Sequence, residues 1–452
     1  MRIIIVGLGN VGTTIARSLS HEGHDLTVID ISEAAVRNCT AGLDIMGLVG
    51  NGATTEMLKT AGIENTDLMI AVTNSDEKNL LACLVARKAG HCNTIARVRD
   101  PEYRKEINHI KDDLGLSFYV NPEHAAAGSI ARLLKFPNAI EVDTFVKGRV
   151  ELLKMKIEEG SVLDGIVLKN MRNTLHCDIL VCMVERAEQT LIPDGNFVLK
   201  SGDLISFVAS AKKANAFFKE VKVLQGRVKS AMIIGGGETT EYLAEQLITN
   251  GVDVKIIEKD MKRCEALAEI LPEATIVNGD GTDKGLITEE GVERVESFIA
   301  LTNQDETNVM MSFYVGKKNP KAKRIVKINK NAYEDIISEM DLGSIVNPKA
   351  ITAEIVVKYV RAMQNSMGSN VETLYRIGDG KAEALEFYVR EGSPLIGKPI
   401  MQLPIDNNVL IACIVHNNVI EIPTGHSVIA AKDTVIVVTT NAGYEDLKDI
   451  LE

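Results

Sequence analysis

Three glycines near the start of the chain have the spacing of a phosphate-binding turn. Gly7, Gly9 and Gly12 form a GxGxxG pattern between an apolar, strand-like run and a helix-like segment. In such a turn the first glycine permits the tight bend, the second lets a pyrophosphate approach the backbone, and the third lets the helix pack on the strand. Free amide groups at the start of the helix then bind phosphate oxygens. The candidate contacts are Gly7, Leu8, Gly9, Asn10, Val11 and Gly12.

An acidic residue follows at the distance at which dinucleotide-binding folds contact a ribose. Asp30 ends the second predicted strand, 18 residues after Gly12. A carboxylate at this position accepts hydrogen bonds from both ribose hydroxyls and would repel a 2′-phosphate, so the pattern favours NAD-type nucleotides over NADP. The structural alternative is a glycine-rich packing turn with an aspartate at the edge of the sheet.

Further polar residues follow the ends of the later strands, at the sheet edge where open α/β sheets bind ligands. These candidates are Asn51, Gly52, Thr73, Asn74 and Arg97. Thr73 and Asn74 have an alternative role as caps of the next helix. Arg97 either pairs with Asp76 or reaches a phosphate, and we expect a polar network around a ligand.

The sequence repeats itself, with a shift of 228 residues over the first two matched segments. The segment "IIIVGLGNVG" at 3–12 returns as "AMIIGGGETT" at 231–240, and "TVID" ending at Asp30 returns as "KIIE" ending at Glu258. "DLMIAVTNSDEKN" at 67–79 is echoed by "SFIALTNQDETN" at 297–308. Ordered matches of this kind indicate an internal duplication.

The second copy keeps only part of the binding pattern. Its candidate contacts are Gly235, Gly237, Glu258, Asp280 and Thr302. Thr240 replaces the third glycine and Lys327 replaces the arginine. We expect Thr240 to loosen the fit between helix and strand, so the second copy either binds the same ligand, binds a different or weaker one, or is purely structural.

Apolar runs alternate with amphipathic segments in a rhythm that predicts a parallel, doubly wound sheet. The first helix is predicted over 10–22 and stops at Gly23, while Asn121-Pro122 and Asn347-Pro348 are predicted helix caps. The predicted strands of the first copy are 2–7, 26–30, 45–49, 68–72, 94–98 and 117–120.

The pattern changes after each copy. Leu153, Met155 and Ile157 alternate with Lys154 and Lys156, which predicts a strand with one solvated face. The same small domain recurs near 371–452. We therefore predict an α/β tandem repeat of two Rossmann-like sheets, each followed by a small α+β domain, with "QNSMGSN" at 364–370 as a linker. The predicted domains span 1–138, 139–225, 226–366 and 367–452.

Composition restricts the possible functions. The net charge of −12 argues against nucleic acid as the main partner, and no apolar run reaches the roughly 18 residues that a membrane span requires. The seven cysteines are scattered without CxxC pairs, which is typical of reduced thiols and predicts no metal site. Met1-Arg2 leads straight into a strand, so we expect no signal peptide and a cytosolic protein.

The same turn also occurs in nicotinamide-dependent enzymes, so an NAD-dependent oxidoreductase is the alternative function. Such an enzyme needs a substrate domain that brings a base, typically His or Lys, to the reactive ring. The small domains offer no evident constellation of this kind, and no GxxxxGK[ST] phosphate loop is present. Ligand binding without evident chemistry favours a sensor.

In order along the chain, "GLGNVG", Asp30, "AVTNSDEKN" and "ARVRDPEY" resemble the RCK (KTN) domains that regulate potassium flux. Two such domains, each trailed by a small domain, resemble the TrkA-type proteins of Trk potassium-uptake systems. The resemblance covers essentially all 452 residues.

This resemblance implies a cytosolic, peripheral regulatory subunit that binds a TrkH-type membrane protein. It implies a homo-oligomeric ring, typically a tetramer of two-repeat chains, in which NAD(H) or ATP/ADP gates potassium entry. Carried over by position, the ligand site of the first copy is Gly7 through Val11, Asp30, Thr73, Asn74 and Arg97. The second copy would contribute Gly235, Gly237, Glu258 and Thr302, although Thr240 departs from the glycine pattern.

Overall fold

A computed structural model describes residues 1–452 except 188, 222–227, 330–339, 366–370, 379, 418, 442, 445 and 452. The predicted domain boundaries at 225/226 and 366/367, and most of the predicted linker at 364–370, therefore lie outside the described residues. The chain forms two compact units, which we describe separately: Met1–Ile130 with Ser230–Val360, and Ala131–Lys229 with Arg361–Glu452.

The first copy of the repeat, in the first unit, contains a six-stranded parallel sheet of order β3-β2-β1-β4-β5-β6. The order reverses between β1 and β4, as in doubly wound folds. The prediction of a parallel, doubly wound sheet is confirmed, and the predicted strand ends agree to within one residue. The strands are β1 (Arg2–Val6), β2 (Asp25–Asp30), β3 (Met46–Val49), β4 (Leu68–Ala71), β5 (Asn93–Arg97) and β6 (Phe118–Val120).

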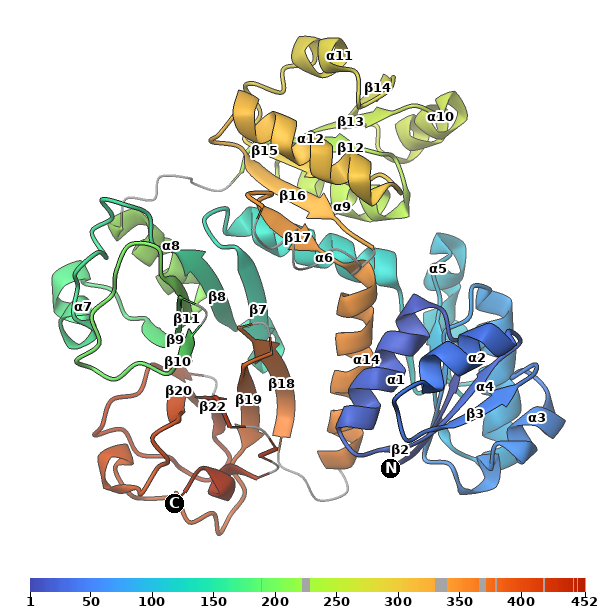
Figure 1. The fold of residues 1–452 in the computed structure, drawn as a ribbon, viewed down its shortest axis with the longest axis horizontal. Coiled ribbons are helices and arrows are strands. Elements are labelled where there is room, and N and C mark those ends of the chain that lie inside the picture. Colours follow the sequence, from blue (N-terminus) through green and yellow to red (C-terminus); the bar gives the residue numbers. More distant parts are fainter. Residues whose placement is uncertain are drawn as a thin grey trace. The chain divides into compact units, whose positions relative to one another are not determined.

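Helices connect these strands and lie against the sheet (Figure 1). The first helix buries Val11, Ile15 and Leu19 and ends before Gly23, whose φ of 76° terminates the helical conformation. The helices of this copy are α1 (Asn10–His21), α2 (Glu33–Thr40), α3 (Thr55–Thr60), α4 (Asp76–Gly90) and α5 (Pro101–Ile110), with a short 3-10 turn at Ile63–Asn65.

The second copy repeats this sheet in the order β14-β13-β12-β15-β16-β17, again all parallel. The strand register is the same in both copies, because Val6 faces Ile29 and Ile234 faces Ile257 at the same shift of 228. The strands are β12 (Ser230–Ile234), β13 (Asp253–Glu258), β14 (Thr275–Asn278), β15 (Ser297–Ala300), β16 (Lys323–Lys327) and β17 (Ser344–Val346). The helices are α9 (Glu238–Thr249), α10 (Met261–Ile270), α11 (Lys284–Glu289) and α12 (Asp305–Lys318).

Two long helices, α6 (Pro122–Lys135) and α14 (Pro348–Asn365), follow the last strand of each copy and continue into the second unit. Both predicted caps are confirmed. The Asn121 Oδ1 accepts a hydrogen bond from the His124 amide at 2.8 Å, and the Asn347 Oδ1 accepts one from the Ala350 amide at 3.2 Å. In the part of the chain that the structure describes, no helix combines the length and apolar character that crossing a membrane requires.

Within the first unit, each of these helices packs against the other copy. The ring of His124 in α6 lies edge-on against Tyr242 of α9, with centroids 5.4 Å apart. Correspondingly, Tyr359 of α14 stacks on Phe118 of β6 at 4.9 Å. The two copies therefore exchange helices, and aromatic contacts hold each exchanged helix in place.

The second unit holds two five-stranded antiparallel sheets of orders β10-β9-β11-β8-β7 and β18-β19-β22-β20-β21. Helices α7 (Leu168–Leu175) and α8 (Ala211–Glu220) accompany the first sheet. Its strands are β7 (Glu141–Phe145), β8 (Val150–Lys156), β9 (Leu180–Arg186), β10 (Gln189–Leu191) and β11 (Leu204–Ser210). The second sheet has β18 (Val371–Ile377), β19 (Ala382–Tyr388), β20 (Val409–His416), β21 (Val419–Glu421) and β22 (Thr434–Thr439).

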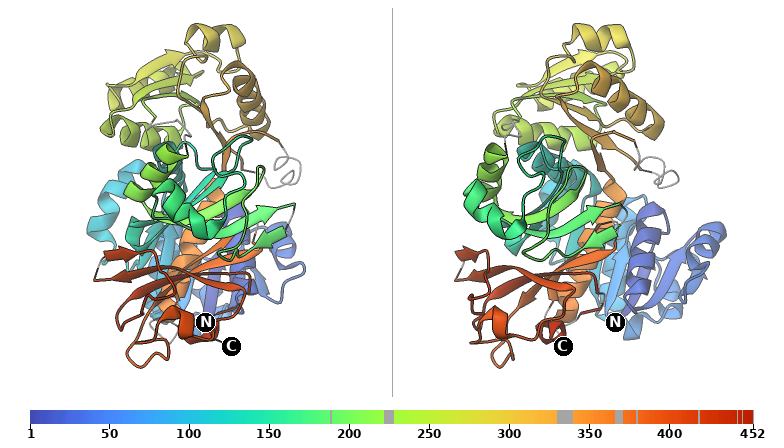
Figure 2. Two further views of the ribbon diagram at one scale, coloured as in Figure 1. Left: turned by 90° about the vertical axis from the view of Figure 1, so that its left-hand side faces the viewer. Right: turned by 60° about the vertical axis from the view of Figure 1, so that its left-hand side comes forward.

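The predicted solvated face of β8 is wrong except at its last residue, Lys156, which is exposed. Lys154 is only 8% exposed and forms ion pairs with Glu185 at 2.9 Å and Glu141 at 3.7 Å. The reason is that the two small sheets share an apolar core, which includes Val150 and Leu152 on that face of β8. Figure 2 shows the two sheets, green and red, next to each other in both views. Local alternation could not reveal that the second small domain covers this face.

Candidate functional site

The turn after β1 has the geometry that the glycine spacing predicts. Gly7 has a φ of 97°, and a Cβ added there would lie 2.7 Å from the Thr73 amide nitrogen. A Cβ on Gly12 would lie 1.9 Å from the Gly7 carbonyl oxygen, so these two glycines are required by packing. A Cβ on Gly9 would meet no atom within 4 Å. Gly9 therefore borders open space at the start of α1, next to the exposed Asn10.

The Asp30 carboxylate is fixed by the turn itself. One oxygen accepts the Leu8 amide at 2.6 Å and the other accepts the Ser32 amide at 2.8 Å. Both bonds are charge-assisted, so Asp30 orients the glycine turn as well as the loop after β2. Each carboxylate oxygen has a further acceptor position. The structural role and the predicted ribose contact are thus compatible.

Asn51 and Gly52 lie at the same sheet edge, after β3. The Asn51 Oδ1 accepts the Ala53 amide at 3.1 Å, which shapes the loop before α3. A Cβ on Gly52 would lie 2.4 Å from a methyl carbon of Val6, so this glycine allows the loop to pack closely on β1. The contacts of both residues are structural ones.

Thr73 is held by a buried asparagine. Its amide and its hydroxyl both donate to Oδ1 of Asn79, at 2.8 and 2.7 Å. Asn79 is fully buried and donates in turn to the Arg97 carbonyl at 2.9 Å, so it joins the ends of β4 and β5. The helix cap of α4 is Ser75, whose hydroxyl accepts the Lys78 amide, so neither Thr73 nor Asn74 caps this helix.

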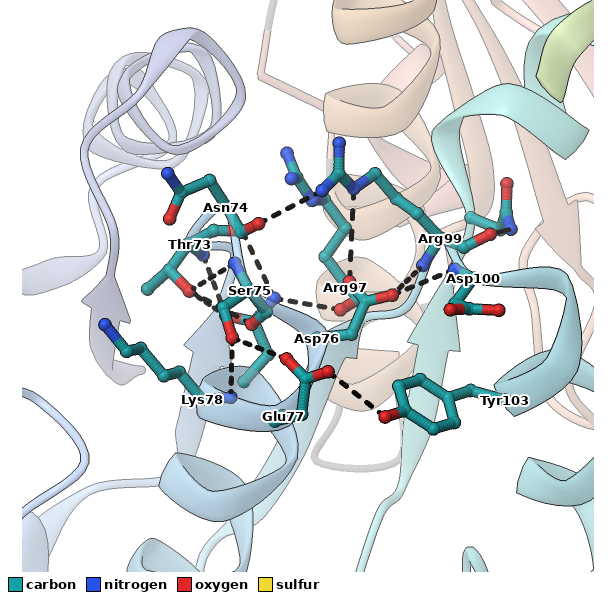
Figure 3. Close-up of polar contacts among 12 residues, drawn as sticks. Thr73, Asn74, Ser75, Asp76, Glu77, Lys78, Arg97, Arg99, Asp100 and Tyr103 are labelled. Atoms are coloured by element: carbon teal, nitrogen blue, oxygen red, sulfur yellow. Dashed lines mark hydrogen bonds and ion pairs between the residues drawn. The ribbon is translucent and has the colours of Figure 1, made fainter. Parts of the chain in front are cut away.

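Arg99, rather than Arg97, is the ion-pair partner of Asp76 (Figure 3). The Arg99 Nε lies 4.0 Å from the Asp76 carboxylate, whose other oxygen accepts the amides of Arg99 and Asp100 at 2.7 and 2.9 Å. A second nitrogen of the Arg99 guanidinium donates to the Asn74 carbonyl at 3.0 Å. Arg99 thereby fixes the backbone of the Asn74 loop.

In the described part of the chain, the guanidinium group of Arg97 does not have hydrogen-bond partners for all of its nitrogen atoms. Within the described ranges, its Nε is buried and has no hydrogen-bond partner. Burial, followed by the charge of Arg99, lowers the pKa of Arg97, while the carboxylates of Glu123 and Glu238 act in the opposite direction. An anionic group would satisfy this guanidinium, in keeping with the expectation that Arg97 reaches a phosphate.

The second copy forms a similar turn with a different composition. Gly235 has a φ of 97°, and a Cβ on Gly237 would meet no atom within 4 Å. The Glu258 carboxylate accepts the Gly236 amide at 2.6 Å and the Asp260 amide at 2.8 Å, as Asp30 does in the first copy. The Thr240 hydroxyl donates to the Gly235 carbonyl at 2.5 Å.

The loop after β15 also matches the first copy. The amide and hydroxyl of Thr302 donate to the buried Asn308, at 3.0 and 2.7 Å, and Asn308 donates to the Lys327 carbonyl at 2.9 Å. The Lys327 Nζ contacts the Asn303 Oδ1 at 3.3 Å, and burial lowers the pKa of this lysine. Asp280 instead accepts the amide and hydroxyl of Thr282, and these bonds lower its pKa.

Several residues that organise these sites were missed at the level of sequence. Asn79 and Asn308 were visible as the last shared letter of the repeated segments "SDEKN" and "QDETN". Tyr242 carried no local signal, because these contacts of its side chain come from the other copy. The Tyr242 hydroxyl lies 3.3 Å from the Asn121 Nδ2 and 3.4 Å from the Arg99 carbonyl.

The first copy therefore combines an open helix start, a fixed carboxylate and an arginine at the carboxyl edge of a parallel sheet. This set supplies donors for phosphate and acceptors for hydroxyl groups, which is what nucleotide recognition needs. In the described portion of the chain, no three His, Cys, Asp or Glu residues gather in a group that could hold a metal ion.

Comparison with known proteins covers nearly the whole chain. The TrkA-N domain model matches residues 3–122 and 231–348, and the TrkA-C domain model matches 152–222 and 384–452. The "Trk system potassium uptake protein TrkA homolog" of Archaeoglobus fulgidus is 33% identical over 456 residues, all of both chains. The "Trk system potassium uptake protein TrkA" of Haemophilus influenzae is 30% identical over 97% of this chain and 95% of its own.

Among solved structures, the "GsuK channel bound to NAD" has a TM-score of 0.61 at 16% identity, covering 97% of this chain and 77% of that one. The human SLO3 gating ring has a TM-score of 0.50 at 10% identity, covering 97% and 99%. At such identities the likeness shows the fold alone.

Fold and domain matches together define the class: two TrkA-N domains of the doubly wound α/β type, each followed by a TrkA-C domain. The chain belongs to the TrkA family of potassium uptake proteins. The members of this family are regulatory proteins of potassium transport and not enzymes, which decides against the oxidoreductase.

Proposed function

We propose that this chain is the cytosolic regulatory subunit of a Trk-type potassium uptake system, and that nucleotide binding in the first copy gates potassium flux through a TrkH-type membrane subunit. The observation that carries the proposal is the match over essentially the full length to proteins called Trk system potassium uptake protein TrkA. The two domain models alternate along this chain, so that each TrkA-N match is followed by a TrkA-C match.

The proposed ligand is NAD(H), with ATP or ADP as alternatives. The open space before Gly9 and the start of α1 would receive the phosphates, and Asp30 would accept the ribose hydroxyls. Arg97 would contact a phosphate, because its Nε has no other partner among the described residues. A protein of the same fold is described as a channel bound to NAD, which supports this choice of ligand.

Gating requires that the ligand favour one of two arrangements of the protein. A ligand shifts an equilibrium only by its difference in affinity for the two states. The candidate contacts come from separate strand ends, namely the turn after β1, the loop after β4 that carries Thr73, and the end of β5 at Arg97, so a bound nucleotide would fix their spacing. Moving a population from 1:99 to 99:1 takes about 5.5 kcal/mol, which several chains in a ring can supply together.

The proposed assembly is a homo-oligomeric ring, typically a tetramer, that lies on the inner face of the cell membrane through its partner. The family assignment is what supports this arrangement. The partner is a potassium-translocating membrane protein, and nucleic acid has no part in the function.

Nucleotide binding is tested first, by calorimetric titration of the purified chain with NADH, NAD, ATP and ADP. Asp30→Ala should weaken binding by at least about 10-fold, because it removes both the ribose acceptor and the anchor of the turn. Asp25→Ala is the matched control. It removes the same group from the other end of β2, where Asp25 is exposed and pairs with Arg2. Equal losses in both variants, or no binding by the wild type, would refute the proposed ligand.

Flux is tested with the TrkH-type subunit of the same organism reconstituted in potassium-loaded vesicles. Adding this chain should make flux depend on the nucleotide that the titration identifies, and Asp30→Ala should remove that dependence. A chain that does not co-purify with the membrane subunit, or flux that ignores all four nucleotides, would exclude the gating role. Oxidation of NADH with a hydroxy or amino acid would instead favour the oxidoreductase.

A further inference from the structure

The two phosphate turns differ most at the start of the helix that follows each of them. In α1 the first turn contains no acidic residue, whereas α9 has Glu238 and Glu241 there. By the repeat shift, Glu238 takes the place of Asn10 and Glu241 that of Thr13. The positive end of a helix attracts anions, and a carboxylate of the chain itself satisfies this preference as a phosphate would.

An arginine from α10 reinforces this difference. The Arg263 Nε donates to the Gly236 carbonyl at 2.6 Å, and another guanidinium nitrogen lies 2.8 Å from the Glu241 carboxylate. The corresponding residue of the first copy is Ala35, which has no such group. The mouth of the second turn is thus lined by an ion pair from within the chain.

The third glycine position widens the second turn. Thr240 is fully buried, and its hydroxyl is bonded to the Gly235 carbonyl at 2.5 Å. A Cβ on Gly235 would lie 3.1 Å from the next strand end, against 2.7 Å for Gly7 in the first copy. The turn at Gly235 therefore lies farther from the end of β15 than the turn at Gly7 lies from the end of β4.

Glu238 is also within electrostatic range of the first copy. Partial burial raises its pKa, as does Glu123, while the charge of Arg99 lowers it. The same carboxylate influences Arg97. The Glu238 carboxylate therefore lies in the first turn of its own helix and interacts electrostatically with Arg99 and Arg97 of the first copy.

We infer that only the first copy receives the phosphates of a nucleotide, that Glu238 and Glu241 fill the equivalent place in the second copy, and that each chain binds one nucleotide. The inference rests on the proposed nucleotide binding in the first copy. It makes residues 238 and 241 the determinants of which copy binds.

The test exchanges the two turns. NADH is titrated into the full-length protein by calorimetry and equilibrium dialysis, with wild type, Asn10→Glu, and a triple variant Glu238→Asn, Thr240→Gly and Glu241→Thr. Wild type should bind one NADH per chain. Asn10→Glu should weaken this binding at least 10-fold, and the triple variant should bind two. Glu269→Asn, which removes an exposed carboxylate from α10, should bind one NADH with unchanged affinity.

Two binding events per wild-type chain would overturn the inference and leave the proposed function intact. A triple variant that retains a cooperative melting transition but still binds one NADH would also overturn it. If the triple variant does not fold, Asn10→Glu decides: retained affinity in that variant overturns the inference, because a carboxylate at the helix start would then not exclude phosphate. Absence of any binding by wild type and by the triple variant would refute nucleotide sensing itself.

Discussion

Asn79 and Asn308 perform the same task in the two copies, because each links the ends of two neighbouring strands. Each accepts two hydrogen bonds from a threonine after one strand and donates to a carbonyl at the end of the next. Both are fully buried, and each Nδ2 also donates to the carbonyl of the same threonine, at 3.3 Å in the first copy and 3.1 Å in the second, so groups of the protein satisfy these amides. The shape of the loop that carries Thr73 therefore depends on one amide group.

Replacing this amide should cost both stability and binding. Asn79→Ala leaves the Thr73 amide and the Arg97 carbonyl without a partner, so we expect a loss of about 2–3 kcal/mol in the free energy of unfolding. Urea denaturation measures the loss, and calorimetry should show weaker nucleotide binding. Asn308→Ala should destabilise the protein by a similar amount but leave the affinity within about 2-fold. Equal loss of affinity in both variants would contradict this division of roles.

For single residues, the sequence predicted the location of a side chain in the fold better than it predicted the groups that the side chain contacts. The carboxyl-edge location of Asp30, Thr73 and Arg97 followed from the strand pattern, because parallel strands end at one edge. The sequence did not predict which arginine pairs with Asp76. Arg97 and Arg99 are only two residues apart, and the direction of each side chain depends on the path of the chain after β5. Asn79 was hidden because a buried asparagine in the first turn of a helix resembles an ordinary helix residue.

Different glycines of the turn after β1 serve different purposes: one is needed for packing, and another leaves space for a ligand. Gly12 has no room for a side chain, since a Cβ would lie 1.9 Å from the Gly7 carbonyl oxygen. Gly9 has an ordinary extended conformation, with φ −68° and ψ −173°, and faces no atom within 4 Å. The folded chain by itself gives no reason for a glycine at position 9.

A pair of alanine variants tests this separation. Gly12→Ala should lower the free energy of unfolding by about 2–3 kcal/mol through overpacking. Gly9→Ala should change it by less than about 1 kcal/mol, because the site is open and the backbone conformation suits alanine. Gly9→Ala should nevertheless weaken nucleotide binding by at least about 10-fold, because the methyl group occupies the space for the phosphate. Thermal melting and calorimetry measure both effects, and an unimpaired Gly9→Ala would place the ligand elsewhere.

Strand β16 carries a lysine in an unusual setting. Lys323 is 8% exposed, its Nζ donates to the Ser344 hydroxyl at 2.9 Å, and burial lowers its pKa to about 7. Above pH 7 the folded protein releases this proton, whereas an unfolded lysine keeps it up to about pH 10.4. The unfolded chain binds more protons over this interval, so the contribution of Lys323 to the free energy of unfolding increases with pH.

Lys323→Met should remove this dependence. The difference in melting temperature between the variant and the wild type should favour the variant most at pH 7 and below, and should shrink steadily between pH 7 and pH 10. Melting curves at half-unit intervals of pH measure it. The exposed Lys321→Met is a control that should leave the pH dependence as in the wild type, and a constant difference across the range would refute a buried, titrating lysine.

At the scale of the whole molecule, the duplication is what organises the first unit. The helix that leaves each copy packs on the other, through His124 with Tyr242 and Phe118 with Tyr359. The repeat, the fold class and the order of the domains could be predicted from sequence because they rest on local periodicity and on self-comparison. The exchange of helices could not, because the small and apolar residues of α6 carry no local signal that says which copy the helix contacts.

The exchange is tested by a double-mutant cycle on Phe118 and Tyr359. Phe118→Ala, Tyr359→Ala and the double variant should show a coupling of about 0.5–1.5 kcal/mol in the free energy of unfolding, as expected for stacked rings 4.9 Å apart. Phe118→Ala combined with Tyr242→Ala provides a pair without ring contact and should be close to additive. Additivity in the first pair would mean that α14 does not pack on β6.

The crossed helices have a further consequence, because both copies belong to one polypeptide. A pair formed between separate chains dissociates on dilution, but the tethered copies meet at an effective concentration that can reach the millimolar range whatever the amount of protein in the cell. Pairing therefore continues even if one partner loses its ligand. Acidic residues such as Glu238 and Glu241 are therefore tolerated in the second turn without separating the halves. Because the two copies are fused, one copy can serve only to pack against the other, while the other binds the ligand.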